Sequence, residues 1–432
     1  MNTIATDVED SITRMRAMAR AQQQKPGYSI DGYFYRSHVT YRHELESMVF
    51  RSWLYAGHES QIPDPGDFFQ YEIGEDAFII SRDADGEVHA LVNSCRHRGA
   101  RVCVEPEGNR KAFVCPYHGW TYDCGGELRS ARHMDRVPSF DAAQFGLRQV
   151  RVACRHGMIF MNCDANAYDF NHSLDSVEHA LAPHELGSAR VAHREVYKVD
   201  ANWKFALENY LECYHCATSH RSYARMHTIK DLEVNIAHLR EALHERSEQQ
   251  TGVTGLSRGF EKIYAAAPGF GASSYCSRYA LYGGFVTGSR DGQAVAPLMG
   301  AFKGYDGGAG DFQFGPLCFM LNYPDHCVLY RFTPRSLTST DMEIVWFVNG
   351  SAVEGRDYQK DELTWLWHNT TLEDEIIIKR NSEGANSLFY QPGPYHPELE
   401  QTSIKFINWY LEALQQQPQD RSGQPSAVRT AS

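Results

Sequence analysis

The sequence has no apolar run that could cross a membrane, because no stretch approaches 18 apolar residues. The first ten residues, MNTIATDVED, lack the apolar core of a secretory leader, so we expect a cytoplasmic protein. Basic side chains are in deficit, since 42 Lys and Arg stand against 54 Asp and Glu, for a net charge of -12. That balance argues against nucleic acid as a partner and is compatible with a cationic substrate.

Disulfide and dinucleotide-binding patterns are also missing. The eleven cysteines do not show the spacing of a disulfide-stapled secreted protein, and we interpret them as metal ligands or buried thiols in a reducing compartment. Residues 304–310 (GYDGGAG) are rich in glycine but lack the G-x-G-x-x-G spacing of a dinucleotide-binding turn, and we expect a loop there. Chemistry driven by NAD(P)H would therefore need a second polypeptide.

What the chain does have is room for two domains, since its 432 residues exceed what one hydrophobic core normally supports. Between residues 66 and 163, short β-branched and aromatic runs alternate with Gly, Asp and Pro turns, which predicts a small β-rich domain. The predicted strands are residues 68–73, 78–81, 88–92, 112–115 and 158–161.

The remaining residues predict an α+β arrangement. Apolar periodicity predicts helices over residues 7–24, 43–53, 203–220 and 357–382, with Gly384 available as the C-cap of the last one. Residues 318–347 are expected to form paired strands. Residues 416–432, rich in Pro, Gln and Ser, are expected to be a disordered tail.

Two short segments carry the strongest chemical signal. Residues 95–97 (CRH) and 115–118 (CPYH) together offer two thiolates and two imidazoles from two tight turns. This is the donor set of a Rieske 2Fe-2S centre, in which two His replace two Cys on one iron and raise the potential of the cluster. A structural zinc site accepts the same donors, but the following residues 98–100 (RGA) and 119–122 (GWTY) favour the Rieske centre.

A second motif lies in residues 202–220, NWKFALENYLECYHCATSH. His215 and His220 lie about 140° apart on an ideal helix, so both reach one ion only if the helix ends or distorts near Thr218. Two His and one carboxylate on one face of a metal leave open positions where Fe(II) binds O2 beside a substrate. The alternative is a helix end with two ordinary histidines, but the electron carried by a Rieske centre needs an acceptor.

Both motifs resemble those of a known family. The segments CRHRGA (95–100) and CPYHGWTYD (115–123) resemble the large subunit of Rieske non-haem iron oxygenases, and EN-x-x-E-x-YH-x4-H (208–220) is similar to its mononuclear-iron motif. The resemblance implies a β-rich Rieske domain inserted in a larger, helix-grip-like α+β catalytic domain. We expect an N-terminal helical segment of the catalytic domain over residues 1–45, the Rieske domain over 46–165, and the catalytic domain over 166–415.

The resemblance also implies roles for individual residues. The ligands of the 2Fe-2S cluster would be Cys95, His97, Cys115 and His118. His215 and His220 would bind the mononuclear iron, with Asn209 close to it. Glu212 shares a face of the predicted helix with His215, and it matches the carboxylate that bridges the iron to a cluster histidine of the neighbouring subunit.

The third iron ligand must be a distant acid. Residues 371–375 (TLEDE) contain a Glu-Asp pair similar to the family's (E/Q)-D element, so Asp374 is the expected ligand. Glu373 and Glu375 are nearby competitors, and a solvated acidic helix face is the alternative interpretation of the whole segment.

Further segments resemble the glycine betaine monooxygenase and stachydrine demethylase branch, namely AVEGRDY (352–358), SLFYQPGPYHPELE (387–400) and FINWY (406–410). The resemblance implies a homotrimeric oxygenase component that takes electrons from a separate NAD(P)H-dependent, ferredoxin-type flavin reductase. It would use O2 to hydroxylate and N-demethylate a small quaternary or N-methylated amine such as a betaine. Residues 225–315, which should line the substrate pocket, match no motif.

Two other functions remain open at this point. An aromatic acid or ring substrate would use the same catalyst, and the 12% aromatic content does not decide between them, because aromatic faces bind trimethylammonium groups and also stack on arenes. A non-enzymatic electron carrier or zinc-stabilised binding protein would leave His215, His220 and Asp374 without a purpose.

Overall fold

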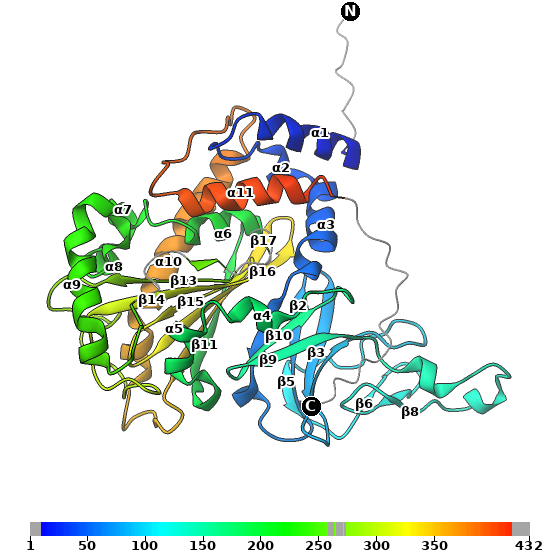
Figure 1. Cartoon of the computed structure of the whole chain (residues 1–432). Coiled ribbons are helices and arrows are strands. Elements are labelled where there is room, and N and C mark those ends of the chain that lie inside the picture. The colour runs from blue at the N-terminus through cyan, green and yellow to red at the C-terminus, as the bar shows by residue number, and fades with distance from the viewer. Residues whose placement is uncertain (1–9, 258–262, 265–270, 272–273, 417–432) are drawn as a thin grey trace, which may run out of the picture.

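The computed structural model describes residues 10–257, 263–264, 271 and 274–416 (Figure 1). Within these residues the chain forms two seven-stranded sheets, one three-stranded sheet and helices that gather around the second large sheet (Figure 1). The predicted α+β class is confirmed. No helix in the described part of the chain has both the length and the apolar character to span a membrane.

The first large sheet has the strand order β1-β10-β9-β4-β3-β2-β5. Its strands are β1 (Leu54–His58), β2 (Asp67–Ile73), β3 (Asp76–Arg82), β4 (Val88–Val92), β5 (Glu107–Asn109), β9 (Gln149–Arg155) and β10 (Met158–Asn162). Beside it lies the small sheet of β6 (Phe113–Val114), β7 (Thr121–Tyr122) and β8 (Leu128–Ser130). All five predicted strands of this region are present, although the one expected over 112–115 ends early because the backbone N–H of Cys115 donates to Trp120 and closes a turn.

The second large sheet is antiparallel, in the order β11-β17-β16-β15-β14-β13-β12. Its strands are β11 (Arg190–Val199), β12 (Ile263–Tyr264), β13 (Ser274–Ala280), β14 (Gly308–Phe314), β15 (Cys318–Asn322), β16 (Cys327–Ser336) and β17 (Ser339–Val348). The paired strands predicted over 318–347 are therefore confirmed. The loop predicted over 304–310 is wrong for its last three residues, which begin β14. A Cβ on Gly308 would lie 2.9 Å from Leu243 Cδ1, so close packing requires the glycine there.

The helices are α1 (Ile12–Gln23), α2 (Tyr33–Arg36), α3 (His38–Ser47), α4 (Phe170–Leu174), α5 (Glu178–Leu181), α6 (Trp203–Tyr210), α7 (Cys216–Ser219), α8 (Arg221–Ala224), α9 (Glu233–Thr251), α10 (Lys360–Ala385) and α11 (Gln401–Ala413). The long α10 packs against β11 and α6, while the N-terminal α1 packs against the C-terminal α11 (Figure 1).

Three predicted helices have different boundaries in the structure. The helix predicted over 43–53 starts earlier, because Ser37 accepts the backbone N–H of Thr40 and caps α3, and it ends at Ser47. The helix predicted over 357–382 extends to Ala385 with Asn386 as its C-cap, so Gly384 lies inside α10 and is not a cap. The first predicted helix begins at Ile12, and residues 7–9 lie outside the described residues, as do residues 417–432 of the expected tail.

A buried ion pair joins three helices. Lys204 Nζ on α6 lies 2.7 Å from Glu44 Oε1 on α3, and both side chains are fully buried. Tyr410 on α11 donates its hydroxyl to Glu44 at 2.6 Å, and Trp203 donates its indole N–H to the same carboxylate at 2.7 Å. Burial lowers the pKa of Lys204, and the Glu44 carboxylate opposes that effect. These bonds fix α6, which leads into the site described below.

We expect Lys204→Ala to lower the free energy of unfolding by about 3–5 kcal/mol, because it leaves the buried Glu44 carboxylate without its counter-charge. The double variant Glu44→Gln with Lys204→Met should recover most of that loss, since neither buried position is then charged. Chemical denaturation followed by circular dichroism measures both. Equal losses in the single and double variants would show that the charge pairing is not what stabilises this junction.

Candidate metal centres

Two matching turns present the first group of donors. In each turn the backbone N–H of the cysteine is bonded to a carbonyl five residues later, and the N–H of a glycine four residues later is bonded back to the cysteine. Those glycines, Gly99 and Gly119, have φ of +80° and +72°, a conformation that residues with a Cβ rarely adopt. Cys95 follows β4, and Cys115 lies between β6 and β7, so the two turns come from two different sheets.

The donor atoms of these turns meet. His97 Nδ1 and His118 Nδ1 lie 3.1 Å apart, and Cys95 and Cys115, which are 3% and 2% exposed, contact each other through their side chains. Burial raises the pKa of the Cys115 thiol, so a thiolate here requires a metal cation. Trp120 stacks on His97 with its ring centroid 5.0 Å away. Two buried sulfurs and two converging imidazole nitrogens fit a Rieske cluster.

Tyr122 is part of this site, and our sequence interpretation gave it no role. Its hydroxyl lies 3.2 Å from Cys95 Sγ and accepts the backbone N–H of Arg96 at 3.1 Å. A hydroxyl that accepts one hydrogen bond from the backbone is oriented to donate its own proton to the sulfur. Hydrogen bonds to cluster sulfurs tune the reduction potential of the cluster. The sequence signal for this role was Tyr122 itself, an aromatic residue two positions after Trp120.

The second group of donors depends on a helix that ends early. The helix predicted over 203–220 is wrong, because α6 ends at Tyr210 and separate short helices follow at α7 and α8. The Glu212 carboxylate folds back and accepts the backbone N–H groups of Tyr214 and His215, which stabilises the turn that replaces helix. Glu212 and His215 therefore meet across this turn and not along one helical face.

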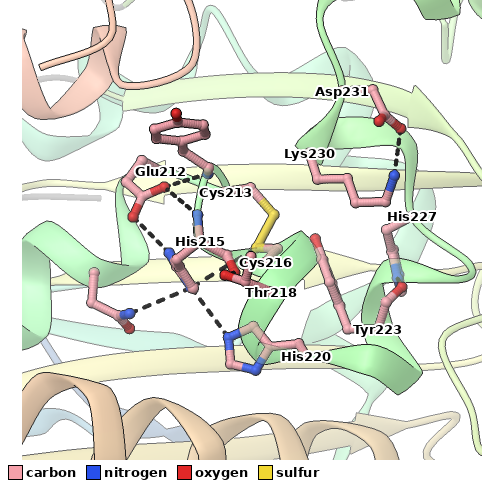
Figure 2. Close-up of a disulfide and its surroundings, with 12 residues drawn as sticks. Glu212, Cys213, His215, Cys216, Thr218, His220, Tyr223, His227, Lys230 and Asp231 are labelled. Atoms are coloured by element: carbon pink, nitrogen blue, oxygen red, sulfur yellow. Dashed lines mark hydrogen bonds and ion pairs between the residues drawn. A yellow bond between two sulfur atoms is a disulfide. The ribbon is translucent and has the colours of Figure 1, made fainter.

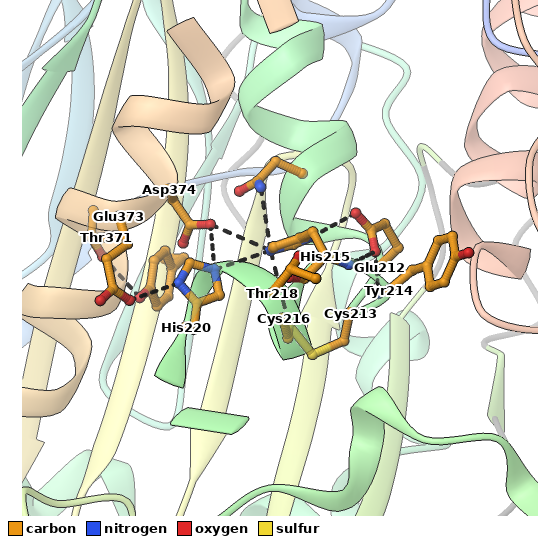
Figure 3. A network of polar contacts seen from close by, with 12 residues as sticks. Glu212, Cys213, Tyr214, His215, Cys216, Thr218, His220, Thr371, Glu373 and Asp374 are labelled. Atoms are coloured by element: carbon orange, nitrogen blue, oxygen red, sulfur yellow. Dashed lines mark hydrogen bonds and ion pairs between the residues drawn. A yellow bond between two sulfur atoms is a disulfide. The ribbon is translucent and has the colours of Figure 1, made fainter. Parts of the chain in front are cut away.

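Three donor atoms converge beyond this turn (Figure 3). His215 Nε2 lies 3.1 Å from His220 Nε2, and Asp374 Oδ1 lies 3.4 and 2.9 Å from these two nitrogens. Ligands at right angles on one ion, with bonds of about 2.1 Å, stand about 3 Å apart. Asp374 Oδ1 is buried and accepts no hydrogen bond of ordinary geometry within the described residues. Two His and one carboxylate in this arrangement fit a mononuclear iron with open positions.

Two further acids hold the imidazoles in place. Glu212 Oε1 lies 2.6 Å from His215 Nδ1, and Glu373 Oε2 lies 2.9 Å from His220 Nδ1 (Figure 3). A carboxylate at Nδ1 keeps the proton there and leaves Nε2 free to bind a metal. Of the three acids considered for α10, Asp374 is the one that meets Nε2 of both imidazoles, and Glu373 contacts Nδ1 of His220. Asn209 Nδ2 lies 3.4 Å from His215 Nε2, beside the metal position.

The electrostatics of this cluster favour a cation. Burial alone lowers the pKa of His215, but the carboxylates of Asp374 and Glu212 outweigh burial and raise it to about 9. The pKa of His220 is raised in the same way, against its burial, by Asp374 and Glu373. Burial raises the pKa of Asp374, but the two imidazoles lower it overall. The site therefore gathers negative charge that a divalent ion compensates.

Cys213 and Cys216 form a disulfide on the same turn (Figure 2). The interpretation of all cysteines as thiols or metal ligands is wrong for this pair, and its Cys-x-x-Cys spacing was the overlooked signal. Cys216 Sγ lies 3.9 Å from His215 Nε2, but a sulfur already bonded to Cys213 is not a thiolate ligand. The donors that suit iron are thus His215, His220 and Asp374. Cys216 is not one of them.

A cavity of about 430 Å³ opens beside the three converging donors. Pockets of this size hold small organic ligands. Much of its wall is aromatic, with Tyr210, Tyr223, Tyr279, Phe319, Tyr330 and Trp367 among the lining residues. Part of its wall comes from residues 228–313, the region that matched no motif.

Comparisons with known proteins agree with these centres. Residues 52–141 match the profile of the Rieske [2Fe-2S] domain, and residues 186–416 match that of the ring hydroxylating alpha subunit (catalytic domain). The glycine betaine monooxygenase oxygenase subunit of Pseudomonas aeruginosa PAO1 is 32% identical over 388 residues, which cover 90% of this chain and 89% of the relative.

Two other relatives are informative. The biphenyl 2,3-dioxygenase alpha subunit of Rhodococcus jostii RHA1 is 39% identical, but only over 44% of this chain and 43% of the relative. The crystal structure of the quaternary ammonium Rieske monooxygenase CntA with its substrate L-carnitine has a TM-score of 0.66 and 19% identity, and it covers 93% of this chain and 99% of that chain. This likeness shows the fold, and the identity to the Pseudomonas protein shows the family.

We expect Asp374→Asn to reduce bound iron from about three to about two atoms per chain, because one anionic ligand of the mononuclear ion is lost. The Rieske EPR signal should persist, since its donors lie elsewhere. Glu375→Gln is the matched control on the same helix and should keep all the iron. Glu373→Gln should weaken iron binding about 10–100-fold, as expected for a group that orients a ligand. Full iron content in Asp374→Asn would contradict the ligand assignment.

Proposed function

Because this chain belongs to the family of ring-hydroxylating oxygenase alpha subunits, with a Rieske domain and a catalytic domain, we propose that it hydroxylates and N-demethylates a small quaternary ammonium compound such as a betaine. As a family member the protein is an oxidoreductase, the oxygenase component of a system with a Rieske cluster and a mononuclear iron. It needs a separate reductase and a small-molecule substrate. The proposal concerns the substrate class and the residues that serve it.

The observation that carries the proposal is the aromatic cavity beside the three converging donors, in a chain 32% identical over 90% of its length to a glycine betaine monooxygenase subunit, which favours a quaternary ammonium group over an arene. A quaternary ammonium group has no N–H to donate, so its recognition depends on aromatic faces and on opposite charge. Tyr223 and Trp367 meet edge to face at 5.5 Å between ring centroids, and Tyr330 meets Trp367 at 5.9 Å, so the rings form one continuous wall. The glycine betaine substrate named for the Pseudomonas relative supports the same class.

The residues divide the chemistry between them. We assign Cys95, Cys115, His97 and His118 to the cluster, and His215, His220 and Asp374 to the iron. When bound, these groups supply single electrons and the reductive activation of O2. Glu212 and Glu373 hold the protons at Nδ1 of the two iron-ligand imidazoles, and the aromatic wall excludes water and holds the substrate beside the open positions.

The proposed overall reaction balances as a monooxygenation. One N-methyl group, O2, two electrons and two protons give an N-hydroxymethyl group and water. The N-hydroxymethyl product then breaks its C–N bond, and the tertiary amine leaves with formaldehyde and one proton. The electrons come from NAD(P)H through the separate reductase, for which we propose a ferredoxin-type flavoprotein.

The substrate class is tested with the iron-loaded protein, a surrogate NADH-dependent reductase and a panel of glycine betaine, proline betaine, carnitine and aromatic acids. We expect formaldehyde and O2 consumption in a ratio near one for at least one betaine, because each turnover releases one methyl group. Hydroxylation of an aromatic acid without formaldehyde from any betaine would refute the betaine assignment and leave the family assignment intact.

We also propose that the chain works as a homotrimer in which cluster and iron of neighbouring subunits cooperate. Within one chain, β6 and β8 beside the cluster turns lie at the opposite end of the molecule from α7 beside the iron donors (Figure 1). A head-to-tail ring would bring them together through a heterologous interface that closes by rotation. Glu212, already bonded to His215 Nδ1 at 2.6 Å, is the proposed connection to His118 of the neighbour.

The predicted domain limits 46–165 and 166–415 and the cytoplasmic location stay predictions.

We expect Glu212→Gln, supplied with enough Fe(II) to fill both metal centres, to lose at least about 90% of coupled turnover, because the carboxylate that links the two centres becomes neutral. Glu195→Gln, an exposed acid on β11, is the control and should retain full activity. Metal analysis, EPR and formaldehyde release provide the readouts, and light scattering gives the oligomeric state. A monomer with full activity would rule out electron transfer between subunits.

A further inference from the structure

The sheet side of the substrate cavity contains one acid at the middle of β14. Along this strand, Phe312 and Phe314 belong to the apolar cluster on the opposite face of the sheet, whereas Asp311 and Gln313 line the cavity. This alternation is the ordinary two-residue period of a strand. The Asp311 side chain is half-buried, and its Oδ1 atom is shielded from solvent.

The strand register fixes the position of Asp311. Its partners across the sheet are Ser277 on β13 and Leu321 on β15, and both of these residues also line the cavity. Neighbouring strands stand about 4.8 Å apart, so Asp311 has a small hydroxyl on one side and an apolar side chain on the other. The carboxylate therefore faces the cavity from rigid sheet and not from a loop.

The surroundings of Asp311 are aromatic. Burial raises the pKa of Tyr210, Tyr223 and Tyr279, and the negative charge of Asp311 adds to the increase at all three hydroxyls. The field of this carboxylate thus reaches tyrosines from α6, α8 and β13. All three line the same cavity.

Several other charged groups at the cavity wall are held in ion pairs or in the iron centre. Arg278 binds Asp306 through hydrogen bonds of 3.0 and 2.5 Å, and Glu233 pairs with Arg240. Asp231 pairs with Lys230 at 2.7 Å. Asp374 and Glu212 belong to the iron centre. The position of Asp311, on rigid sheet and within reach of three cavity tyrosines, suits a cationic ligand.

We propose that Asp311 is the specificity-determining residue of the cavity, and that its carboxylate lies against the quaternary ammonium group while the tyrosine and tryptophan faces contact the methyl groups. The proposal rests on the proposed function and deepens it. A permanent cation cannot neutralise a carboxylate by giving it a proton, so the two remain a charged pair in a site of low dielectric constant. Aromatic faces add cation–π attraction on the remaining sides.

The test compares two ligands of nearly the same shape and different charge: glycine betaine and 3,3-dimethylbutanoate, in which carbon replaces the quaternary nitrogen. Binding to the iron-loaded protein is measured by calorimetry without reductase, so turnover does not contribute. Wild type should bind the betaine at least about tenfold more tightly than its neutral-headed isostere. Asp311→Asn keeps the shape of the side chain and should abolish this preference, chiefly by weakening betaine binding.

Two further variants control the comparison. Glu398→Gln removes one negative charge from the same cavity wall and should leave the preference within about threefold of wild type, because this acid comes from the segment before α11 and not from the sheet side of the cavity. Asp311→Glu keeps the charge and should retain a preference for the betaine. Iron content and thermal unfolding verify that each variant is folded. If Asp311→Asn does not fold, Asp311→Glu becomes the test variant. Loss of the preference in Asp311→Glu, which keeps the charge, would count against the proposal.

The outcomes separate the two proposals. A wild-type preference for the betaine that persists in Asp311→Asn would overturn the role of Asp311 and leave the proposed function standing. Equal loss in Asp311→Asn and Glu398→Gln would also overturn it, because general cavity charge would then explain the effect. A wild-type protein that does not prefer glycine betaine would overturn the role of Asp311, whereas the proposed function is decided separately by formaldehyde release across the panel of betaines.

Discussion

The site depends on one constraint: two imidazole nitrogens and one carboxylate oxygen must lie about 3 Å apart in a buried place. The donors come from chain segments about 150 residues apart, since His220 contacts Glu373 across a separation of 153. Such a group is stable only with a cation at its centre or protons on its nitrogens. Three features bring the donors together: α10 runs beside α6, α6 ends early, and Glu212 caps the turn that follows.

Two carboxylates outside the group of three donors orient the two imidazole rings. Glu212 and Glu373 each bind the Nδ1 of one imidazole, so both rings turn Nε2 toward Asp374. The cluster turns present the opposite ring nitrogen, because there the two Nδ1 atoms meet at 3.1 Å. Histidines thus present different ring nitrogens at the two candidate centres, and local backbone geometry decides which atom is presented.

The cavity wall is formed by two parts of the chain, of which only one carries recognisable motifs. The iron side carries motifs that resemble those of the family, whereas the sheet side comes from β13 and β14, where no motif was recognisable. A biphenyl dioxygenase subunit is 39% identical over 44% of the chain, and a shared fold does not by itself specify the substrate. Asp311, on the sheet side, is where a charge could set that choice.

The sequence by itself determined the two donor sets, the α+β class and most strands, because tight ligand turns and alternating apolar residues are local patterns. It did not determine where the 203–220 helix ends, since the Glu212 carboxylate competes with helical hydrogen bonds only once the chain has turned. It favoured Asp374 but left Glu373 and Glu375 as competitors, because only the packing of α10 decides which acid faces the imidazoles. The place of Asp311 among tyrosines of α6, α8 and β13 was likewise decided by tertiary structure, which brings distant segments around one cavity.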